Sequence, residues 1–337
     1  MATRGCTSFR TEREASTIRS PDRVPPVGSA ASHSFLTSND AVTSSATALP
    51  ADIAREYPFQ PKRFEIDGVH MSYVDEGTGP VILFSHGNPT WSFAWRKLLA
   101  DLSADHRVIA VDHIGMGLSD QPLNYRYELD QHISNLNRLI RHLDLRDITL
   151  VGHDWGGCIG MGAAGRDPSR FRQFVMMNTA AFRSQRIPLR IAVCRIPGLG
   201  AFGVRGLNLF SRAALTMAVV NPQVMTPAVR HGYLYPHSNW ARRIAVHQFV
   251  LDIPLHPGHR SYETLVGVEE GLQQFQTHRM LLCWGEQDWC FTTAFLDEWE
   301  RRFPQAQTFR LPHAGHYLFE DDPQTLLAHI RQWLAQA

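Results

Sequence analysis

The chain lacks the features that mark several common protein classes. No run of eighteen apolar residues occurs, so we expect no membrane span. The 33 lysines and arginines nearly balance the 32 acidic residues, and a net charge of +1 suggests neither nucleic acid nor a strongly acidic partner. Cysteine is scarce, with five scattered residues in 337. An odd and dispersed set argues against a disulfide framework or a zinc site and is typical of a cytoplasmic protein.

Residues 1–50 also lack hydrophobic periodicity. They are rich in Ser, Thr, Arg and Pro, a composition that does not form a packed core. The apolar segment of a secretory signal is missing from them. We therefore expect residues 1–50 to be a disordered extension.

Beyond residue 50 the sequence alternates between two kinds of segment. Apolar strand-like runs at 81–85, 107–112 and 148–151 are separated by helix-like stretches. Strands that are apolar throughout and alternate with helices are typical of a parallel sheet covered on both faces. We therefore predict that residues 51–181 form the first part of an α/β core.

The alternation stops at residue 182. Between residues 182 and 265 prolines interrupt helix-like pieces, and no clear strand is visible. Strands and helices resume over residues 266–337. This order predicts a helical cap, residues 182–265, inserted between two parts of the core.

The most informative motif is Gly152-His153-Asp154-Trp155-Gly156-Gly157, which lies between a strand-like and a helix-like segment. That setting is typical of the G-x-S-x-G nucleophile elbow, with Asp154 in place of serine. A carboxylate is ionised at pH 7 and attacks a saturated carbon directly, forming an ester on the enzyme. The alternative is that Asp154 only caps the next helix.

A base and an acid complete the predicted site. His316 follows the last strand-like run, where chain order in such hydrolases places the base; His313 is the nearest alternative. The base needs a carboxylate to orient it. Asp288 lies beyond the tip of the strand that follows the cap and is favoured over Glu286, which we interpret as a solvated turn residue.

One further motif bears on the active site, the loop His86-Gly87-Asn88-Pro89-Thr90-Trp91-Ser92. In this architecture the backbone N–H of Asn88 and that of Trp155 form an oxyanion hole. Their side chains add an amide N–H and an indole N–H, two neutral donors suited to a large leaving anion. The alternative is a proline-stiffened loop with packed tryptophans.

Asn88-Pro89-Thr90-Trp91 and His153-Asp154-Trp155-Gly156 together resemble the haloalkane dehalogenase family, from about residue 64 to the C-terminus. The acid at Asp288 resembles its third subfamily. The resemblance implies an α/β-hydrolase fold with a mostly parallel eight-stranded sheet and an inserted helical cap. It also implies hydrolysis of a small apolar haloalkane by water to a primary alcohol and halide, with Asp154 as nucleophile, His316 as base and Asn88 with Trp155 binding halide. No cofactor or metal is needed.

Three alternatives stay open at this point. A β-lactone decarboxylase of long-chain olefin synthesis shares these motifs. An epoxide hydrolase shares the elbow and would use tyrosines of the cap, for which Tyr233 and Tyr235 are candidates. A receptor that only binds a small ligand is the third, and the sequence also leaves a homo-oligomer open. Several apolar residues are candidates for the pocket lining: Phe182, Leu209, Phe210, Leu215, Phe249, Val250 and Leu318.

Overall fold

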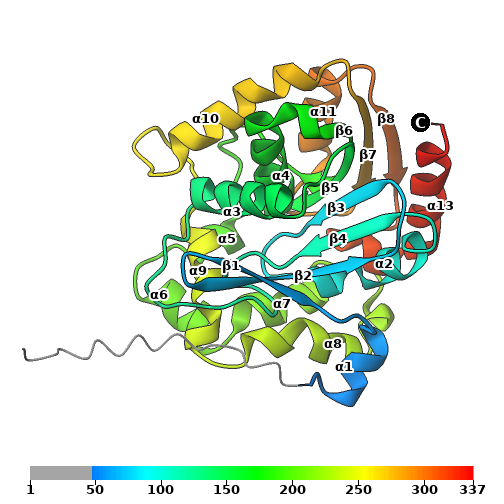
Figure 1. Ribbon diagram of the computed structural model, residues 1–337. Coiled ribbons are helices and arrows are strands. Elements are labelled where there is room, and N and C mark those ends of the chain that lie inside the picture. The colour runs from blue at the N-terminus through cyan, green and yellow to red at the C-terminus, as the bar shows by residue number, and fades with distance from the viewer. Residues whose placement is uncertain (1–47, 337) are drawn as a thin grey trace, which may run out of the picture. The chain divides into compact units, whose positions relative to one another are not determined.

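A computed structural model describes residues 48–336 (Figure 1). The predicted disordered extension, residues 1–50, therefore lies almost wholly outside the described residues. Within the described part no helix is long and apolar enough to cross a bilayer.

Eight strands form one sheet in the order β1-β2-β4-β3-β5-β6-β7-β8. Strand β2 runs antiparallel to β1 and β4, and every other neighbouring pair is parallel. This confirms the predicted mostly parallel eight-stranded sheet. The strands are β1 (Lys62–Ile66), β2 (Val69–Glu76), β3 (Val81–Ser85), β4 (Arg107–Val111), β5 (Ile148–Asp154), β6 (Phe171–Thr179), β7 (Arg279–Gly285) and β8 (Gln307–Leu311).

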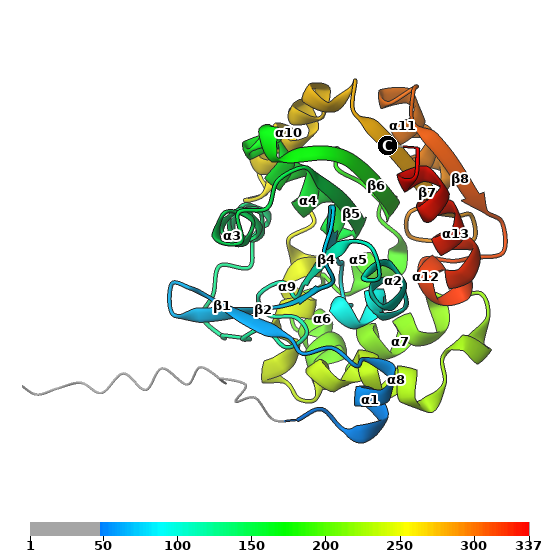
Figure 2. The same ribbon diagram turned by 45° about the vertical axis from the view of Figure 1, so that its right-hand side comes forward.

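Helices cover both faces of the sheet because successive side chains of a strand point to opposite sides. On β3, Leu83 joins one buried cluster while Ile82 and Phe84 join the other. Figure 2 shows α3 and α10 on one side of the sheet and α2 and α13 on the other. The first side has α3 (Leu129–His142), α4 (Trp155–Arg166), α10 (Tyr262–Gly271) and α11 (Thr293–Arg302); the second has α2 (Arg96–Leu102), α12 (Leu318–Asp321) and α13 (Pro323–Leu334).

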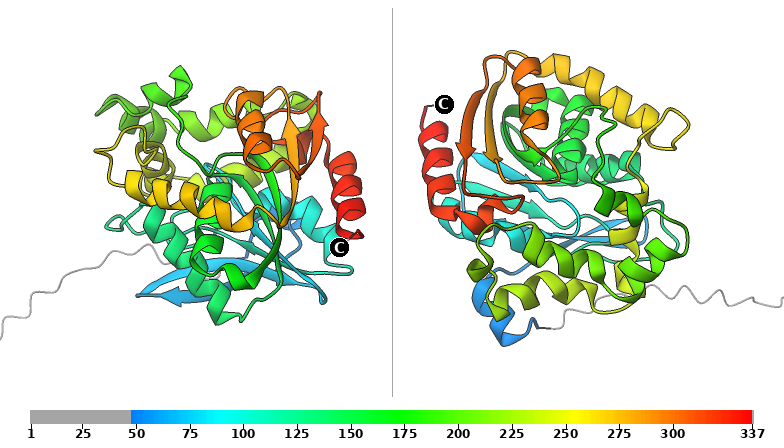
Figure 3. Two further views of the ribbon diagram at one scale, coloured as in Figure 1. Left: turned by 90° about the horizontal axis from the view of Figure 1, so that it is seen from above. Right: turned by 180° about the vertical axis from the view of Figure 1, so that it is seen from behind.

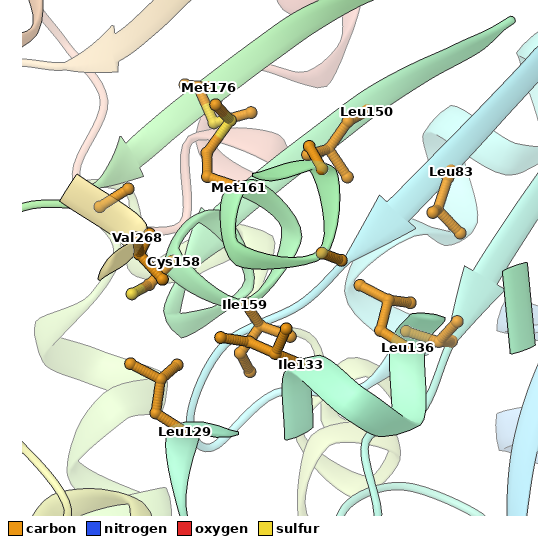
Figure 4. Close-up of a cluster of buried hydrophobic side chains, with 14 of the residues drawn as sticks. Leu83, Leu129, Ile133, Leu136, Leu150, Cys158, Ile159, Met161, Met176 and Val268 are labelled. Carbon is orange, nitrogen blue, oxygen red and sulfur yellow. The ribbon is translucent and has the colours of Figure 1, made fainter. Parts of the chain in front are cut away.

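The core that supports the elbow lies between the sheet and helices α3 and α4 (Figure 4). Ile133 of α3 and Ile159 of α4 are fully buried next to each other there, in the same hydrophobic cluster as Leu150 of β5. A Cβ on Gly160 would lie 2.8 Å from the Leu150 side chain, so the glycine lets α4 approach β5 closely. This packing holds the start of α4 against the end of β5.

The segment between β6 and β7 is helical, and no strand occurs within residues 182–251 of the described chain. Its α-helices are α5 (Leu189–Val193), α6 (Leu199–Ala201), α7 (Leu209–Met217), α8 (Pro227–Leu234) and α9 (Ile244–Leu251). In both views of Figure 3 these helices, green to yellow-green, lie away from α13, which is red. The exact cap boundaries stay a prediction. The predicted limit at residue 265 falls inside α10, which packs on α4 of the core.

A buried ion cluster ties the inserted helices to the core. Glu320 of α12, with no exposed surface, accepts hydrogen bonds from Arg96, from Lys97 (2.8 Å) and from the hydroxyl of Tyr233 on α8 (2.7 Å). Burial opposes ionisation of Glu320, but Arg96 and Lys97 outweigh it and hold its pKa below the ordinary value. Glu320 is therefore the buried countercharge of the Arg96 guanidinium, whose Nε also lies 3.5 Å from the partly exposed Glu56 carboxylate.

We expect Glu320→Ala to lower the free energy of unfolding by about 3–5 kcal/mol, because the buried guanidinium of Arg96 would lose its buried countercharge and keep only the partly exposed Glu56 at 3.5 Å. Denaturant unfolding of the two proteins measures the difference. Glu286→Ala is the matched control: Glu286 pairs with Arg310 in a half-exposed ion pair, whose loss costs about 1 kcal/mol or less. Equal losses for the two variants would contradict a special role for the buried cluster.

Candidate active site

The turn from β5 into α4 has the geometry expected of a nucleophile elbow. Asp154 ends β5 with φ 51° and ψ −127°, a backbone conformation that is unfavourable for residues other than glycine. The helix begins at the next residue, Trp155. A Cβ on Gly156 would collide with the backbone carbonyl of Ser85, so only glycine permits this close approach of α4 to β3. The turn therefore holds the Asp154 side chain at the carboxyl end of the sheet.

The Asp154 carboxylate lies against the loop after β3. Gly87 leaves room for it, since a Cβ there would overlap the carboxylate. The backbone N–H of Asn88 donates to Asp154 Oδ1 at 2.6 Å, and the backbone N–H of Trp155 also donates to the carboxylate. Burial raises the pKa of Asp154, while His316 and these two amides act in the opposite direction. The two backbone donors predicted for an oxyanion hole thus meet at Asp154.

The imidazole of His316 lies between two carboxylates. Its Nδ1 is 2.7 Å from Oδ2 of Asp288, and its Nε2 is 3.9 Å from Oδ2 of Asp154. Burial opposes protonation of His316, but Asp288 and then Asp154 outweigh it and raise its pKa. An imidazole held this way has a fixed ring orientation and stabilises positive charge, which is what a base needs.

Asp288 is held by groups that the sequence analysis did not assign to the site. Its Oδ2 also accepts from the side-chain amide of Asn178 at 3.0 Å, and its Oδ1 accepts from the backbone N–H of Cys290 at 2.6 Å. Asn178 bonds the backbone of Gly285 as well, so it joins the ends of β6 and β7. The position of Asn178, a polar residue near the end of a parallel strand, could have identified it from the sequence as a candidate site residue.

The alternatives to these residues lie elsewhere. Glu286 forms an ion pair with Arg310 at 3.2 Å and does not bond the imidazole. His313 is exposed, whereas His316 is buried. The structure therefore brings Asp154, His316 and Asp288 together and leaves Glu286 and His313 outside the cluster.

The two predicted side-chain donors face the same cavity as Asp154. The amide Nδ2 of Asn88 donates one hydrogen bond to the backbone carbonyl of Val246 on α9 at 3.1 Å. The second N–H of that amide has no bond to the described protein. The indole of Trp155 packs edge-on against Phe249, with ring centroids 5.4 Å apart. Helix α9 thus orients both donors. No local sequence motif predicts these two contacts.

A cavity of about 360 Å³ extends from these groups between α5 and α7. Its walls are mainly apolar, and Asp154, Asn88, Trp155 and His316 form its polar end. Such an arrangement binds an apolar molecule and presents one reactive group to the carboxylate.

Four of the seven predicted lining residues line this cavity, namely Phe182, Leu209, Phe210 and Val250. The prediction was wrong for Leu215, Phe249 and Leu318, which are buried in the hydrophobic core instead. All three lie on helices where neighbouring faces look equally apolar in the sequence. Cys290, two residues after Asp288, also lines the cavity.

The candidate tyrosines of an epoxide hydrolase are not placed for that chemistry. Tyr233 is buried, and its hydroxyl donates to Glu320. Neither Tyr233 nor Tyr235 lines the cavity, and no other tyrosine of residues 48–336 does.

Comparison with known proteins agrees with this architecture. A family model described as alpha/beta hydrolase fold matches residues 80–323. The chain belongs to the alpha/beta hydrolase fold family, and within it to the group that resembles the haloalkane dehalogenases.

Individual relatives are of two kinds. A cis-3-alkyl-4-alkyloxetan-2-one decarboxylase of Shewanella oneidensis is 39% identical over 285 residues, which cover 83% of this chain and 89% of the relative. Haloalkane dehalogenase 2 of Mycobacterium tuberculosis is 30% identical over 279 residues, 81% of this chain and 94% of that protein. The crystal structure of a haloalkane dehalogenase from Agrobacterium tumefaciens matches with a TM-score of 0.75 and 25% identity, covering 82% of this chain and 96% of the other.

Proposed function

We propose that this protein decarboxylates cis-3-alkyl-4-alkyloxetan-2-ones, four-membered lactones that carry two alkyl chains, to alkenes. The observation that carries this choice is the higher identity to the Shewanella decarboxylase, 39%, than to the Mycobacterium dehalogenase, 30%. The sequence alone had placed dehalogenation first, and the higher identity to the decarboxylase supports the opposite order. An apolar cavity with one carboxylate at its end suits a compact ring with two alkyl chains.

In the first step the Asp154 carboxylate attacks the saturated ring carbon that bears the ring oxygen. The bond between that carbon and the ring oxygen breaks, and the electron pair leaves on the oxygen as a free carboxylate. Oδ2 of Asp154 is the attacking atom, because Oδ1 is engaged by the Asn88 backbone N–H. The Asn88 side-chain amide and the Trp155 indole line the cavity beside Asp154 and would stabilise the departing carboxylate.

In the second step the new carboxylate leaves as carbon dioxide. Its bond to the neighbouring ring carbon breaks, those electrons form the carbon–carbon double bond, and the ester bond to Asp154 breaks to return the carboxylate. Atoms and charge balance without water or a proton donor. Inversion in the first step followed by anti elimination in the second converts a cis lactone to a cis alkene.

Dehalogenation is retained as a second activity of the same groups. Asp154 would displace halide, which Asn88 and Trp155 would bind, and the alkyl ester would then need hydrolysis. His316, oriented by Asp288, would activate water for that step. The two reactions therefore differ in what they require of His316: dehalogenation needs it as a base, and decarboxylation does not.

The purified protein should form cis alkene and carbon dioxide from a synthetic cis-3,4-dialkyl-oxetan-2-one. Gas chromatography of the alkene is the measurement, with bromide release from bromobutane run in parallel. Faster turnover of the lactone supports the proposal. Efficient bromide release with no alkene from the lactone would refute it and return the assignment to haloalkane dehalogenase.

A further inference from the structure

The near-neutral net charge conceals a strongly basic segment. Residues 182–251 contain nine arginines and no lysine, aspartate or glutamate, although the whole chain has a net charge of +1. The rest of the chain is correspondingly acidic. A segment of one sign this long creates a local positive potential that composition alone does not reveal.

Little of this charge is neutralised by carboxylates. Within residues 48–336, Arg183 is the one arginine of the segment that forms an ion pair, with Glu269 at 2.6 Å. The guanidinium of Arg205 lies 4.4 Å from the Trp240 ring centroid, and Arg243 donates to backbone carbonyls. Arg212 is exposed. The positive field therefore extends into solvent.

Large apolar side chains are exposed on the same segment. Leu189 is 79% exposed, Phe202 is 58% exposed and Trp240 is 48% exposed. The others that share this exposure are Val193, Ile196, Leu199, Leu207 and Leu209. Single exposed apolar residues are common on proteins, but a group of them next to unpaired arginines marks an interaction surface.

These side chains are neighbours in space. A Cβ on Gly206 would lie 3.4 Å from the Phe202 ring and 3.7 Å from the Trp240 ring, so the two rings flank that glycine. Leu209 similarly lies 3.7 Å from a Cβ placed on Gly203. Figures 1 and 2 both show α5, α6 and α7 on the same side of the described chain. We call this region, residues 186–212 with Trp240 and Arg242, the basic apolar surface.

The cavity opens on the basic apolar surface. Its wall includes Arg190 of α5 and Leu209 of α7, both of which are exposed. Arg190 also lies over the ring of Trp289, another lining residue, at 5.3 Å. A molecule that leaves the cavity between α5 and α7 therefore emerges among the exposed apolar side chains.

We propose that the basic apolar surface docks on an anionic lipid bilayer and that the cavity takes its substrate from the membrane. Arginines attract the negative headgroups, and leucine, phenylalanine and tryptophan side chains enter the boundary between headgroups and acyl chains. An acidic macromolecule would match the charge but would not account for the exposed apolar rings. Delivery of a two-chain lactone from lipid rests on the proposed function; docking itself does not.

Vesicle sedimentation tests docking without any substrate. The full chain should bind vesicles of phosphatidylcholine mixed with phosphatidylglycerol, bind vesicles of phosphatidylcholine alone far less, and lose binding at ~1 M salt, where charges are screened beyond ~3 Å. Arg212→Glu/Arg242→Glu should weaken binding at least about ten-fold, since each basic residue near the surface contributes about 1 kcal/mol. Neither side chain makes a hydrogen bond or ion pair within residues 48–336, so the fold should be kept.

Two controls separate this proposal from general electrostatics. Arg146→Glu/Arg172→Glu changes the charge equally at exposed sites outside the surface and should leave binding within about two-fold. Brominated acyl chains should quench tryptophan fluorescence, and Trp240→Phe should remove most of that quenching. Equal loss of binding in both double variants, or no vesicle binding, would overturn docking. A dimer that Phe202→Gln dissociates, with no vesicle binding, would show that a second copy covers the surface.

Alkene formation from detergent-dispersed lactone is measured separately. Failure of that assay with intact vesicle binding would refute the proposed function and leave docking standing. Failure of vesicle binding with active enzyme would do the reverse.

Discussion

Asp154→Asn is expected to lower the rate of alkene formation from the lactone by at least about 10⁴-fold, because the amide is not a nucleophile. Asparagine has the same shape and still offers an oxygen to the Asn88 backbone N–H, which Asp154 Oδ1 accepts at 2.6 Å. The elbow should therefore keep its geometry, and the unfolding midpoint should change little. Alkene yield per unit time and thermal unfolding measure the two parts of this prediction.

The His316→Gln variant tests whether alkene formation needs a base. Lactone decarboxylation by the two steps above consumes no water, so this variant should still form alkene. We expect a rate within about a hundred-fold of wild type, because removal of His316 also removes its electrostatic effect on the Asp154 carboxylate. With bromobutane the same variant should stop after one turnover. Intact-protein mass spectrometry should then find a butyl group on Asp154.

Two outcomes would contradict this mechanism. If His316→Gln lost alkene formation as completely as Asp154→Asn, a base would be required and the water-free elimination would be wrong. If an alkyl group appeared on any residue other than Asp154, the nucleophile would be misassigned. Asp154→Ala, which has no side-chain amide to hydrolyse back to a carboxylate, is the control for residual activity.

Stability should fall steeply as the pH drops from about 6.5 toward 4. Burial lowers the pKa of His86 and His237 to about 4 and that of His132 to about 3. Between those values and 6.5 the unfolded chain takes up protons that the folded chain does not. Each histidine can therefore remove up to about 1.4 kcal/mol of stability per pH unit in that window and nothing above it. Burial raises the pKa of Asp112 to about 6, which offsets part of the loss.

His132→Leu isolates one of these groups. His132 packs against Phe249 and Tyr127, and neither ring nitrogen bonds another group of the described protein, so the change breaks no such bond. Denaturant unfolding at several pH values should show the slope between pH 6 and 4.5 reduced by about 1 kcal/mol per pH unit. His256→Gln, at an exposed site, should leave the slope unchanged. An unchanged slope in His132→Leu would contradict the assignment.

Much of the catalytic cluster was predictable because each part is a local signal at a strand end. Asp154 is the last residue of β5, Asp288 follows β7 and His316 follows β8. The carboxyl ends of parallel strands lie at one edge of a sheet, so residues far apart in sequence meet there. The pattern of apolar runs therefore predicted both the sheet and the place where these three side chains converge.

The partners that orient the cluster were not predictable in the same way. The amide of Asn88 reaches a carbonyl on α9 that lies 158 residues away, and Asn178 bonds Asp288 across 110 residues. Neither contact has a sequence period or a spacing rule. The short helices of the inserted segment, and α12 after β8, also have several apolar faces that look alike in the sequence. Leu215 and Phe249 of the inserted segment and Leu318 of α12 were misassigned to the cavity for that reason.

By itself, the sequence determined the α/β alternation, the strand-end positions of Asp154, Asp288 and His316, and the absence of acidic residues from 182–251. Only the tertiary structure decided which histidine and carboxylate meet, where the cavity opens, and that arginines and apolar side chains share one exposed surface. The physical reason is the separation along the chain over which each kind of interaction acts. Strand, helix and turn preferences act between residues close in the chain, whereas a site and a surface are set by packing between elements that the sequence separates widely.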